Sequence, residues 1–250
     1  MPIFAAYRSR RPNTPLARVV FFDVCRWLTH VYVRLCHSYR RRRRDRLPQT
    51  GPFLIVCNHQ SFLDPILAGN AIVPHQMTSL ARHGLFKNFI LGPLLRAFYT
   101  VPVHQGESDP KAIKTIIADL KDGYPVLIFP EGARTDDGAL QAFQRGVAII
   151  IRRSGAPVLP VAVEGAFDAW PRGRSWPRAF RTPTRAMVGE LIPNDELLAE
   201  GPDEALRRLE REIDAMRLEL RAELRSKSKG RYPAPGPGDQ PFVYEPPESE

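Results

Sequence analysis

Residues 52–65 read PFLIVCNHQSFLDP, in which an unbroken apolar run gives way to a polar stretch and then to an aspartate followed by proline. A continuous apolar run of this length is typical of a strand buried on both faces of a parallel sheet. Asp64-Pro65 is a good helix start, because aspartate caps helix N-termini and proline is favoured at the first helical position. The stretch therefore predicts a strand, a tight polar loop and a helix.

The same alternation continues along the body of the chain. Short apolar runs typical of strands are separated by segments with the composition of helices. The predicted strands are residues 52–57, 76–81, 98–103, 125–129, 157–163 and 185–191, and the predicted helices are residues 65–72, 86–97, 110–122 and 140–153. This order favours an α/β fold, with a sheet covered by helices.

Composition is that of a globular protein, with 43% hydrophobic and 25% charged residues over 250 positions. The net charge of +9 is unevenly distributed, because residues 1–46 hold 12 arginines against two aspartates and the rest of the chain is close to neutral. Cys25, Cys36 and Cys57 are an odd and sparse set that matches no metal motif. This count argues against a disulfide framework and indicates a reducing compartment.

Residues 16–39 predict an amphipathic helix that leads into a run of arginines. Polar residues recur every three or four positions and form one narrow stripe on an otherwise apolar, aromatic surface. Asp23, Arg26 and Arg34 inside the stretch make it a poor membrane-spanning helix, because a single charge costs about 2.5–3.5 kcal/mol to insert. We therefore expect a helix lying in the membrane interface, with the arginines of residues 40–44 on anionic headgroups.

Two other interpretations of this segment stay open. It could be a core helix followed by a solvated cluster of charges, or the arginines could bind nucleic acid. We favour the membrane over nucleic acid, because a bilayer needs an aromatic apolar face and phosphates alone would not require one. The nearly neutral body of the chain also offers no basic face that would continue a nucleic-acid site.

The C-terminal part divides into a helix and a tail. Residues 203–229 have one apolar seam on a charged helix, which packs on the body as the default interpretation or else on a partner or a membrane. Residues 230–250 hold six prolines and four acidic residues, which predicts disorder. The predicted organisation is a basic membrane-associating segment over residues 1–46, a catalytic domain over 47–200, a helix over 201–229 and a disordered tail over 230–250.

The polar loop after residue 57 raises the question whether His59 and Asp64 work together. A helix cap accounts for Asp64 but leaves His59 unexplained. Across a tight loop the two can meet, and a carboxylate on one imidazole nitrogen leaves the other as a base for a hydroxyl. Spacing alone leaves both a catalytic pair and a histidine beside a cap open. A rival pairs Cys57 with His59 as nucleophile and base, but Cys57 closes an apolar run, which favours a buried, inert thiol.

A second polar loop has the sequence FPEGARTDDG at residues 129–138 and follows another predicted strand. Backbone amides and Arg134 at a strand-to-helix turn suit an anionic group such as phosphate. The alternative is an ordinary turn with a surface ion pair between Glu131 and Arg134.

Three motifs occur together in this chain: Asn-His-x-x-x-x-Asp-Pro at 58–65, Phe-Pro-Glu-Gly-x-Arg at 129–134 and Val-Leu-Pro-Val-Ala-Val-Glu-Gly at 158–165. In this order they resemble the glycerolipid acyltransferase family, whose best-known activity is the acylation of lysophosphatidic acid. The resemblance covers roughly residues 47–195. It implies a mixed, largely parallel sheet covered by helices, and the amphipathic N-terminal segment is similar to the anchor of bacterial members.

The resemblance also implies residue roles. His59 would be the general base on the acceptor hydroxyl and Asp64 its orienting partner. The hydroxyl would attack an acyl thioester of acyl-CoA or acyl carrier protein directly, with no acyl-enzyme, no metal and no further cofactor. The implied substrate-binding residues are Asn58, Arg82, Glu131, Gly132 and Arg134, with Arg134 on the acceptor phosphate.

Three positions depart from the family pattern. Gln105 stands where an arginine usually helps to hold the phosphate, Arg82 keeps the charge of a usual lysine, and Ala133 replaces a usual Thr or Ser. One charge-assisted bond to phosphate is worth about 1.5–3 kcal/mol, so these changes bear on which acceptor is used. The expected reaction converts 1-acyl-glycerol-3-phosphate to phosphatidic acid, at the cytoplasmic face of the cell membrane, by a peripheral or monotopic protein. The alternatives are another lyso-lipid acceptor and a non-catalytic lipid-binding module.

Overall fold

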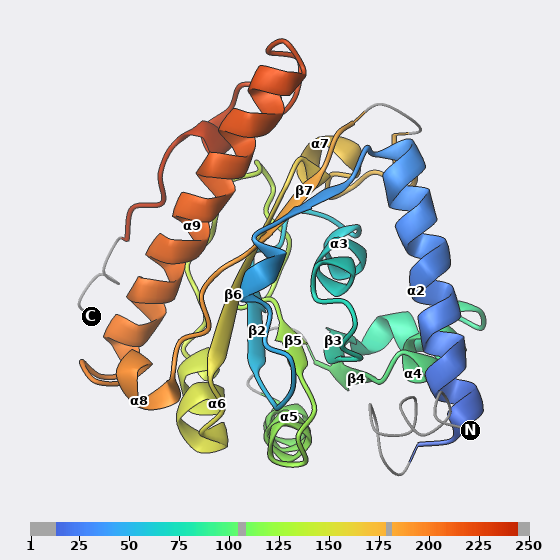
Figure 1. Ribbon diagram of the computed structural model, residues 1–250, viewed down its shortest axis with the longest axis vertical. Coiled ribbons are helices and arrows are strands. Elements are labelled where there is room, and N and C mark those ends of the chain that lie inside the picture. Colours follow the sequence, from blue (N-terminus) through green and yellow to red (C-terminus); the bar gives the residue numbers. More distant parts are fainter. Residues whose placement is uncertain (1–13, 105–108, 179–181, 245–250) are drawn as a thin grey trace.

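The computed structural model describes residues 14–104, 109–178 and 182–244 (Figure 1). Within these ranges seven strands form one sheet in the order β1-β7-β6-β2-β5-β3-β4. Neighbouring strands run parallel, except that β6 and β7 are antiparallel. The predicted mixed, largely parallel sheet is confirmed.

The strands are β1 (Arg40–Arg42), β2 (Leu54–Cys57), β3 (Thr78–Arg82), β4 (Thr100–Val103), β5 (Val126–Ile128), β6 (Val158–Glu164) and β7 (Arg185–Val188). The α-helices are α2 (Leu16–Cys36), α3 (Asp64–Ala71), α4 (Leu91–Ala97), α5 (Pro110–Lys121), α6 (Gly146–Ser154), α7 (Ala166–Ala169), α8 (Asn194–Leu197) and α9 (Pro202–Lys227). Three short 3-10 helices are η1 (Arg44–Arg46), η2 (His83–Lys87) and η3 (Pro237–Asp239).

Alternate residues of the central strands face two apolar cores. From β2, Leu54 and Val56 enter the core shared with α5, α6 and α9, whereas Ile55 and Cys57 enter the core shared with α2, α3 and α7. All four side chains are completely buried. Figure 1 shows α9, α6 and α5 on one side of the sheet and α3 and α2 on the other. Burial on both faces explains why the run at residues 52–57 is continuously apolar.

The arginine run belongs to the sheet, which corrects the predicted boundary between residues 46 and 47. Residues Arg40–Arg42 form β1 and pair in parallel with β7 at the sheet edge. Arg42 forms an ion pair with Glu223 of α9, and Arg43 forms one with Glu219 at 2.6 Å. Part of the charge that we expected on lipid headgroups is therefore bound by carboxylates of α9.

Two predicted helices begin later than their patterns indicate. Within residues 86–97, the Asn88 side chain accepts hydrogen bonds from the two amides at the start of α4, so the regular helix begins after it. Within residues 140–153, the Phe143 N–H donates to the Glu210 carboxylate at 2.7 Å, and α6 begins only after this loop. In both cases a side chain takes an amide that a longer helix would have used.

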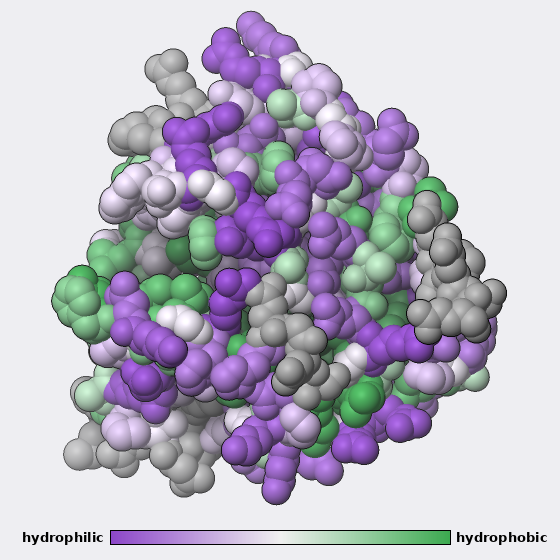
Figure 2. Space-filling model, turned by 180° about the vertical axis from the view of Figure 1, so that it is seen from behind, coloured by the Kyte–Doolittle hydropathy of each residue, from purple (hydrophilic) through white to green (hydrophobic). Residues whose placement is uncertain are grey.

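α2 buries one side and exposes the other. Val19, Phe22 and Val33 are buried, and the Phe22 ring lies 5.1 Å from that of Phe98 at the end of α4. The exposed α2 face consists of Val20, Phe21, Val24, Trp27, Leu28 and Leu35. In Figure 2 hydrophobic side chains gather at the edge where α2 and α4 lie. No helix in the described ranges is both long enough and apolar enough to cross a membrane.

α9 packs on the body of the protein, as the default interpretation of its apolar seam predicted. Leu209, Ile213 and Leu220 are completely buried in the core that also contains α5 and α6.

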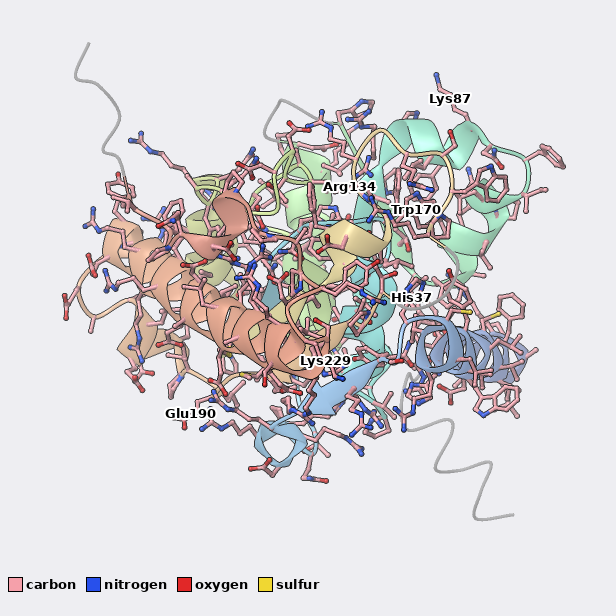
Figure 3. The ribbon with its side chains drawn as sticks, turned by 90° about the horizontal axis from the view of Figure 1, so that it is seen from above. His37, Lys87, Arg134, Trp170, Glu190 and Lys229 are labelled. Carbon is pink, nitrogen blue, oxygen red and sulfur yellow. The ribbon has the colours of Figure 1, made fainter. Side chains whose placement is uncertain are left out.

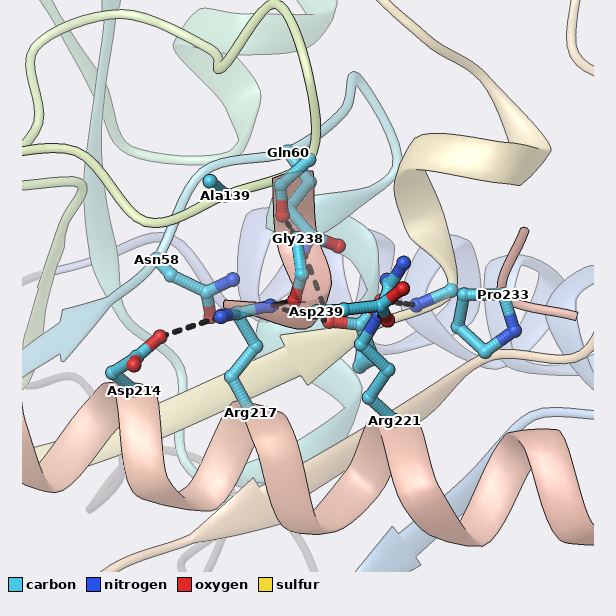
Figure 4. Close-up of polar contacts among 12 residues, drawn as sticks. Asn58, Gln60, Ala139, Asp214, Arg217, Arg221, Pro233, Gly238 and Asp239 are labelled. Atoms are coloured by element: carbon cyan, nitrogen blue, oxygen red, sulfur yellow. Dashed lines mark hydrogen bonds and ion pairs between the residues drawn. The ribbon is translucent and has the colours of Figure 1, made fainter. Parts of the chain in front are cut away.

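The segment after α9 packs against that helix up to residue 244, which corrects the predicted disorder for residues 230–244 of the tail. Arg217 donates to the Gly238 carbonyl at 2.6 Å, and Arg221 donates to the Asp239 carboxylate at 2.6 Å (Figure 4). The arginines of α9 thus supply donors to a proline-rich segment that has few apolar side chains of its own. Residues 245–250 lie outside the described part of the chain.

Candidate active site

The polar loop after β2 brings His59 against Asp64. Nδ1 of His59 lies 2.8 Å from Oδ2 of Asp64, whose side chain is completely buried, whereas the His59 side chain is 18% exposed. Nε2 of His59 has no hydrogen-bond partner among the residues that the structure describes. When Nδ1 carries the proton and donates it to the carboxylate, Nε2 keeps a lone pair that can accept one.

Asp64 acts on the loop rather than on the helix, which corrects its predicted role as a helix cap. The cap position is Leu63, and Asp64 is the first residue of α3. Its Oδ2 also accepts hydrogen bonds from the backbone amides of Gln60 at 2.5 Å and Ser61 at 2.6 Å. Burial raises the pKa of Asp64, and the hydrogen bond from His59 is the largest opposing influence. One buried carboxylate therefore fixes both the loop and the imidazole.

The two predicted loops are bonded to each other through the backbone of His59. Its N–H donates to Oε1 of Glu131 at 2.6 Å, and its carbonyl accepts from the Thr135 amide at 2.9 Å. The His59 ring stacks on Phe129, with centroids 4.1 Å apart. Oε2 of Glu131 accepts from the Gln141 amide at 3.1 Å, and burial raises the pKa of Glu131 well above its usual value. Backbone amides thus occupy both oxygens of this predicted substrate-binding residue.

Gly132 and Asn58 shape the site from within. Gly132 has φ +72°, a backbone conformation that favours glycine, and a Cβ atom there would also displace the end of the Gln144 side chain. The Asn58 amide donates to the Val163 carbonyl at 3.0 Å and accepts from the Val163 amide at 2.8 Å. Asn58 therefore ties the loop to β6, and its side chain is buried away from the opening.

Arg134 supplies an unused donor beside this pair. Its guanidinium lies 3.5 Å from the centroid of the Phe62 ring, and its Nη1 is buried without a hydrogen-bond partner in the described part of the chain. Burial lowers the pKa of Arg134, and the nearby charges of Arg172 and Arg82 lower it further. The charges of Asp64 and Asp136 oppose this effect on the pKa. Three arginines against these two carboxylates leave a local excess of positive charge, which suits an anion.

The loop after α7 belongs to the site, although no role was predicted for it. Arg172 donates to the Asp136 carboxylate at 3.0 Å and remains 44% exposed. The Trp170 carbonyl accepts from the Ser61 hydroxyl at 2.8 Å, and the rings of Trp170 and Phe62 lie 5.2 Å apart. Figure 3 shows Trp170 beside Arg134. The available signal was the aromatic and basic sequence AWPRGR directly after the third motif.

The remaining predicted positions lie at the edge of the site or outside it. Arg82 ends β3 and is exposed, and the next residue, His83, stacks on His104 with centroids 4.7 Å apart. Gln105, where the family pattern has an arginine, lies outside the described residues. Cys57 is completely buried, and burial raises the pKa of its thiol well above the usual value, which argues against a Cys57 nucleophile.

A buried ionic cluster supports the His59 loop from behind (Figure 4). Nε2 of Gln60 donates to the Gly138 carbonyl at 3.0 Å and to Oε2 of Glu164 at 3.1 Å. Oε1 of Glu164 in turn accepts from Arg221 at 3.1 Å. Burial raises the pKa of Glu164, and the Arg221 and Arg217 charges lower it. The His59 loop is thus connected to α9 and, through Arg221, to the segment after it.

No group of three His, Cys, Asp or Glu side chains that could hold a metal ion occurs in residues 14–104, 109–178 and 182–244. The geometry at His59 suits an oriented general base, and the arginines beside it suit an anion.

Comparison with known proteins gives a family and a fold. The acyltransferase family model matches residues 39–164. The 1-acyl-sn-glycerol-3-phosphate acyltransferase of Bacillus subtilis (strain 168) is 32% identical over 144 residues, which are 58% of this chain and 71% of that protein. The chloroplastic 1-acyl-sn-glycerol-3-phosphate acyltransferase BAT2 of Brassica napus is 30% identical over 134 residues, which are 52% of this chain and 38% of that protein.

The crystal structure of the 1-acyl-sn-glycerophosphate (LPA) acyltransferase PlsC from Thermotoga maritima superposes with a TM-score of 0.69 at 24% identity. The match covers 88% of this chain and 89% of that one. The two proteins share their fold.

Proposed function

This chain belongs to the acyltransferase family and is an O-acyltransferase, and from that premise we propose that it acylates the free hydroxyl of 1-acyl-glycerol-3-phosphate to give phosphatidic acid. The observation that carries the proposal is the His59–Asp64 pair beside an arginine with an unused buried donor. An acyl thioester, of coenzyme A or of acyl carrier protein, is the donor in this proposal. Acylation of another lyso-lipid is the alternative.

The proposed chemistry is direct transfer with His59 as the base. Nε2 of His59 takes the proton of the acceptor hydroxyl as the oxygen attacks the thioester carbonyl. The imidazolium that forms is stabilised by Asp64 through Nδ1. When the carbon–sulfur bond breaks, His59 returns the proton to the leaving thiolate, so the base is restored and no acyl-enzyme forms.

The arginine cluster supports a phosphate-bearing acceptor. Nη1 of Arg134 is buried and unpaired among the described residues, and Arg172 and Arg82 add charge close to it. A buried donor that lacks a partner costs free energy, and a phosphate oxygen would remove that cost. Arg172 can thereby supply the positive charge that Gln105 does not.

Arg172→Ser is expected to raise KM for 1-acyl-glycerol-3-phosphate roughly tenfold, the effect of losing one charge-assisted contact. Arg174→Ser, two positions away on the same loop, removes an equal charge and is the matched control. The measurement is initial rates with a labelled acyl thioester, on 1-acyl-glycerol-3-phosphate and on a monoacylglycerol that lacks the phosphate. A KM rise of the same size for both acceptors would contradict phosphate binding by Arg172. Absence of transfer to any lyso-lipid would contradict the proposed function itself.

We propose further that the protein works on a bilayer surface, at the cytoplasmic face of the cell membrane, with the exposed α2 face against the lipid. Trp27 and Leu35 on this face are 63% and 72% exposed, and Phe89 and Ile90 before α4 are exposed on the neighbouring segment. Apolar side chains of this size gain free energy when they leave water for the acyl region of a bilayer.

Trp27→Ser with Leu28→Ser is expected to weaken binding to phospholipid vesicles at least about tenfold, because two apolar side chains no longer insert. The matched control is Val243→Ser with Tyr244→Ser, which removes another exposed apolar pair far from α2. Vesicle co-sedimentation at a series of lipid concentrations measures both. Equal weakening by the two double variants would show that α2 is not the membrane face.

A further inference from the structure

A basic cavity lies away from His59, where the start of β1, the start of β7 and the end of α9 meet. Its volume is about 430 Å³, and its lining includes Arg40, Arg185, Lys227 and Arg231 but no acidic residue. Ser38 and Ser228 also line it, so in Figure 3 it lies between the chain segments that His37 and Lys229 mark. Four cations around one cavity need a counter-charge.

Arg185 is the fixed element of this cavity. It is 3% exposed, and its Nη1 donates to the carbonyls of Ser38 at 2.9 Å and Thr184 at 2.8 Å. Its Nε donates to Glu223 at 3.2 Å. Burial lowers the pKa of Arg185, and the repulsion from Arg42 and Arg40 adds to this effect. The carbonyls of Ser38 and Thr184 therefore hold Arg185 in place close to two other arginines.

A single carboxylate serves three of the nearby cations. Glu223 accepts hydrogen bonds from Arg42, Arg185 and Lys227. These contacts, with that of Arg42 the largest, lower the pKa of Glu223 to about 2, so the carboxylate is ionised at neutral pH. One negative charge does not neutralise three positive ones.

Arg40 and Arg231 have no hydrogen-bond or ion-pair partner on their guanidinium groups in the described part of the chain. Guanidinium groups bind the oxygens of phosphate in a bidentate manner and remain charged at any physiological pH. The cavity is also within the range of small-molecule sites, about 300–1,000 Å³, and so has room for more than a bare ion.

We propose that this cavity is a phosphate-binding site separate from the catalytic one, which takes a free phosphate or the phosphate of an anionic lipid headgroup. Ser38 lies two residues beyond α2, so a lipid lying against the exposed α2 face would have its headgroup near the cavity. The lipid source rests on the proposed function, since it requires α2 on the bilayer. The phosphate site itself does not.

The test compares Arg40→Ser with Arg231→Ser against a matched control, Arg152→Ser with Arg153→Ser. The control removes the same charge from the exposed end of α6. Hydrogen–deuterium exchange of peptides spanning residues 38–42 and 227–232 is measured with inorganic phosphate and with chloride at equal ionic strength. Phosphate is expected to protect these peptides in the wild type and the control, with an affinity at least about tenfold weaker in the cavity variant. No protection in the wild type, or equal weakening in both double variants, overturns the site.

A vesicle arm distinguishes the source of the phosphate. Vesicles of phosphatidylcholine, with or without phosphatidylglycerol, replace the inorganic phosphate in the same exchange measurement. Protection that requires phosphatidylglycerol and is reduced in the cavity variant assigns a lipid headgroup. Protection by inorganic phosphate alone assigns the free anion. Because exchange is read at residues 38–42 and 227–232, the result is independent of whether acyl transfer at His59 is detected.

Discussion

Replacing His59 with alanine is expected to lower kcat for acyl transfer by roughly 10²–10⁴-fold, which is the range that a positioned general base contributes. The backbone bonds of His59 to Glu131 and Thr135 remain in this variant. The free energy of unfolding should still fall by about 1–3 kcal/mol, because the buried Asp64 carboxylate loses its bond from the imidazole. Single-turnover rates and thermal unfolding of the same preparations measure the two effects. A His59→Ala variant with the wild-type rate would exclude His59 as the base.

Asp64→Asn tests the other half of the pair. The asparagine oxygen can still accept from the Gln60 and Ser61 amides, so the loop can keep its shape. The neutral amide no longer stabilises an imidazolium at His59, and kcat should fall while KM is retained. Asp195→Asn removes an exposed carboxylate from α8 and is the control for charge. Equal kcat values in the two variants would contradict the role of Asp64.

Arg217→Met is expected to lower the free energy of unfolding by about 3–5 kcal/mol, the cost of leaving a buried charge without its partner. Arg217 is completely buried, pairs with Asp214 at 2.7 Å and lies 3.6 Å from Glu164. The control is Arg207→Met on the same helix, where the pair with Glu204 at 2.7 Å lies at the surface, is screened by solvent and contributes little to stability. Urea unfolding at neutral pH measures both variants.

A double variant separates charge from packing in this cluster. Arg217→Met with Asp214→Leu removes both partners, so it should be more stable than Arg217→Met alone. If the double variant is less stable than the single one, the loss of the hydrogen bond from the Phe242 amide to the Asp214 carboxylate outweighs the removal of the unpaired charge. The difference in stability between the two variants therefore shows whether the unpaired charge or the hydrogen bonding of Asp214 has the larger effect.

The parts of the fold that were predicted are those whose signal is local. Buried strands such as β2 and β6 are continuous apolar runs, because helices cover both of their faces. β1 gave no such signal, since three consecutive arginines become a strand only through pairing with β7 and ion pairs with α9. The ordered segment after α9 was missed for the same reason. Its partners, Arg217 and Arg221, lie on another element, whereas its own composition indicates disorder.

The residues of the candidate site also divide into those with a local sequence signal and those that depend on tertiary contacts. His59, Asp64 and Arg134 lie in motifs, so the sequence could suggest them and the fold brings them together. Arg172 is an ordinary surface arginine in the sequence and becomes significant only because the loop after α7 returns to Arg134. Glu131 was predicted to contact substrate. In the structure both oxygens of its carboxylate accept hydrogen bonds from backbone amides of the two loops. Residue type predicted the chemistry available, and tertiary contact determined how each group is used.

The contacts between Arg221 and residues 234–239 have a consequence for the order of events during synthesis. A ribosome makes α2 before the segment that supports the His59 loop from behind through Arg221 and Glu164. The helix with the proposed lipid-facing surface is therefore available to a bilayer before the catalytic loop has all of its supporting contacts. Under the proposed function, contact of α2 with the bilayer would therefore precede completion of the site that acts on its lipids.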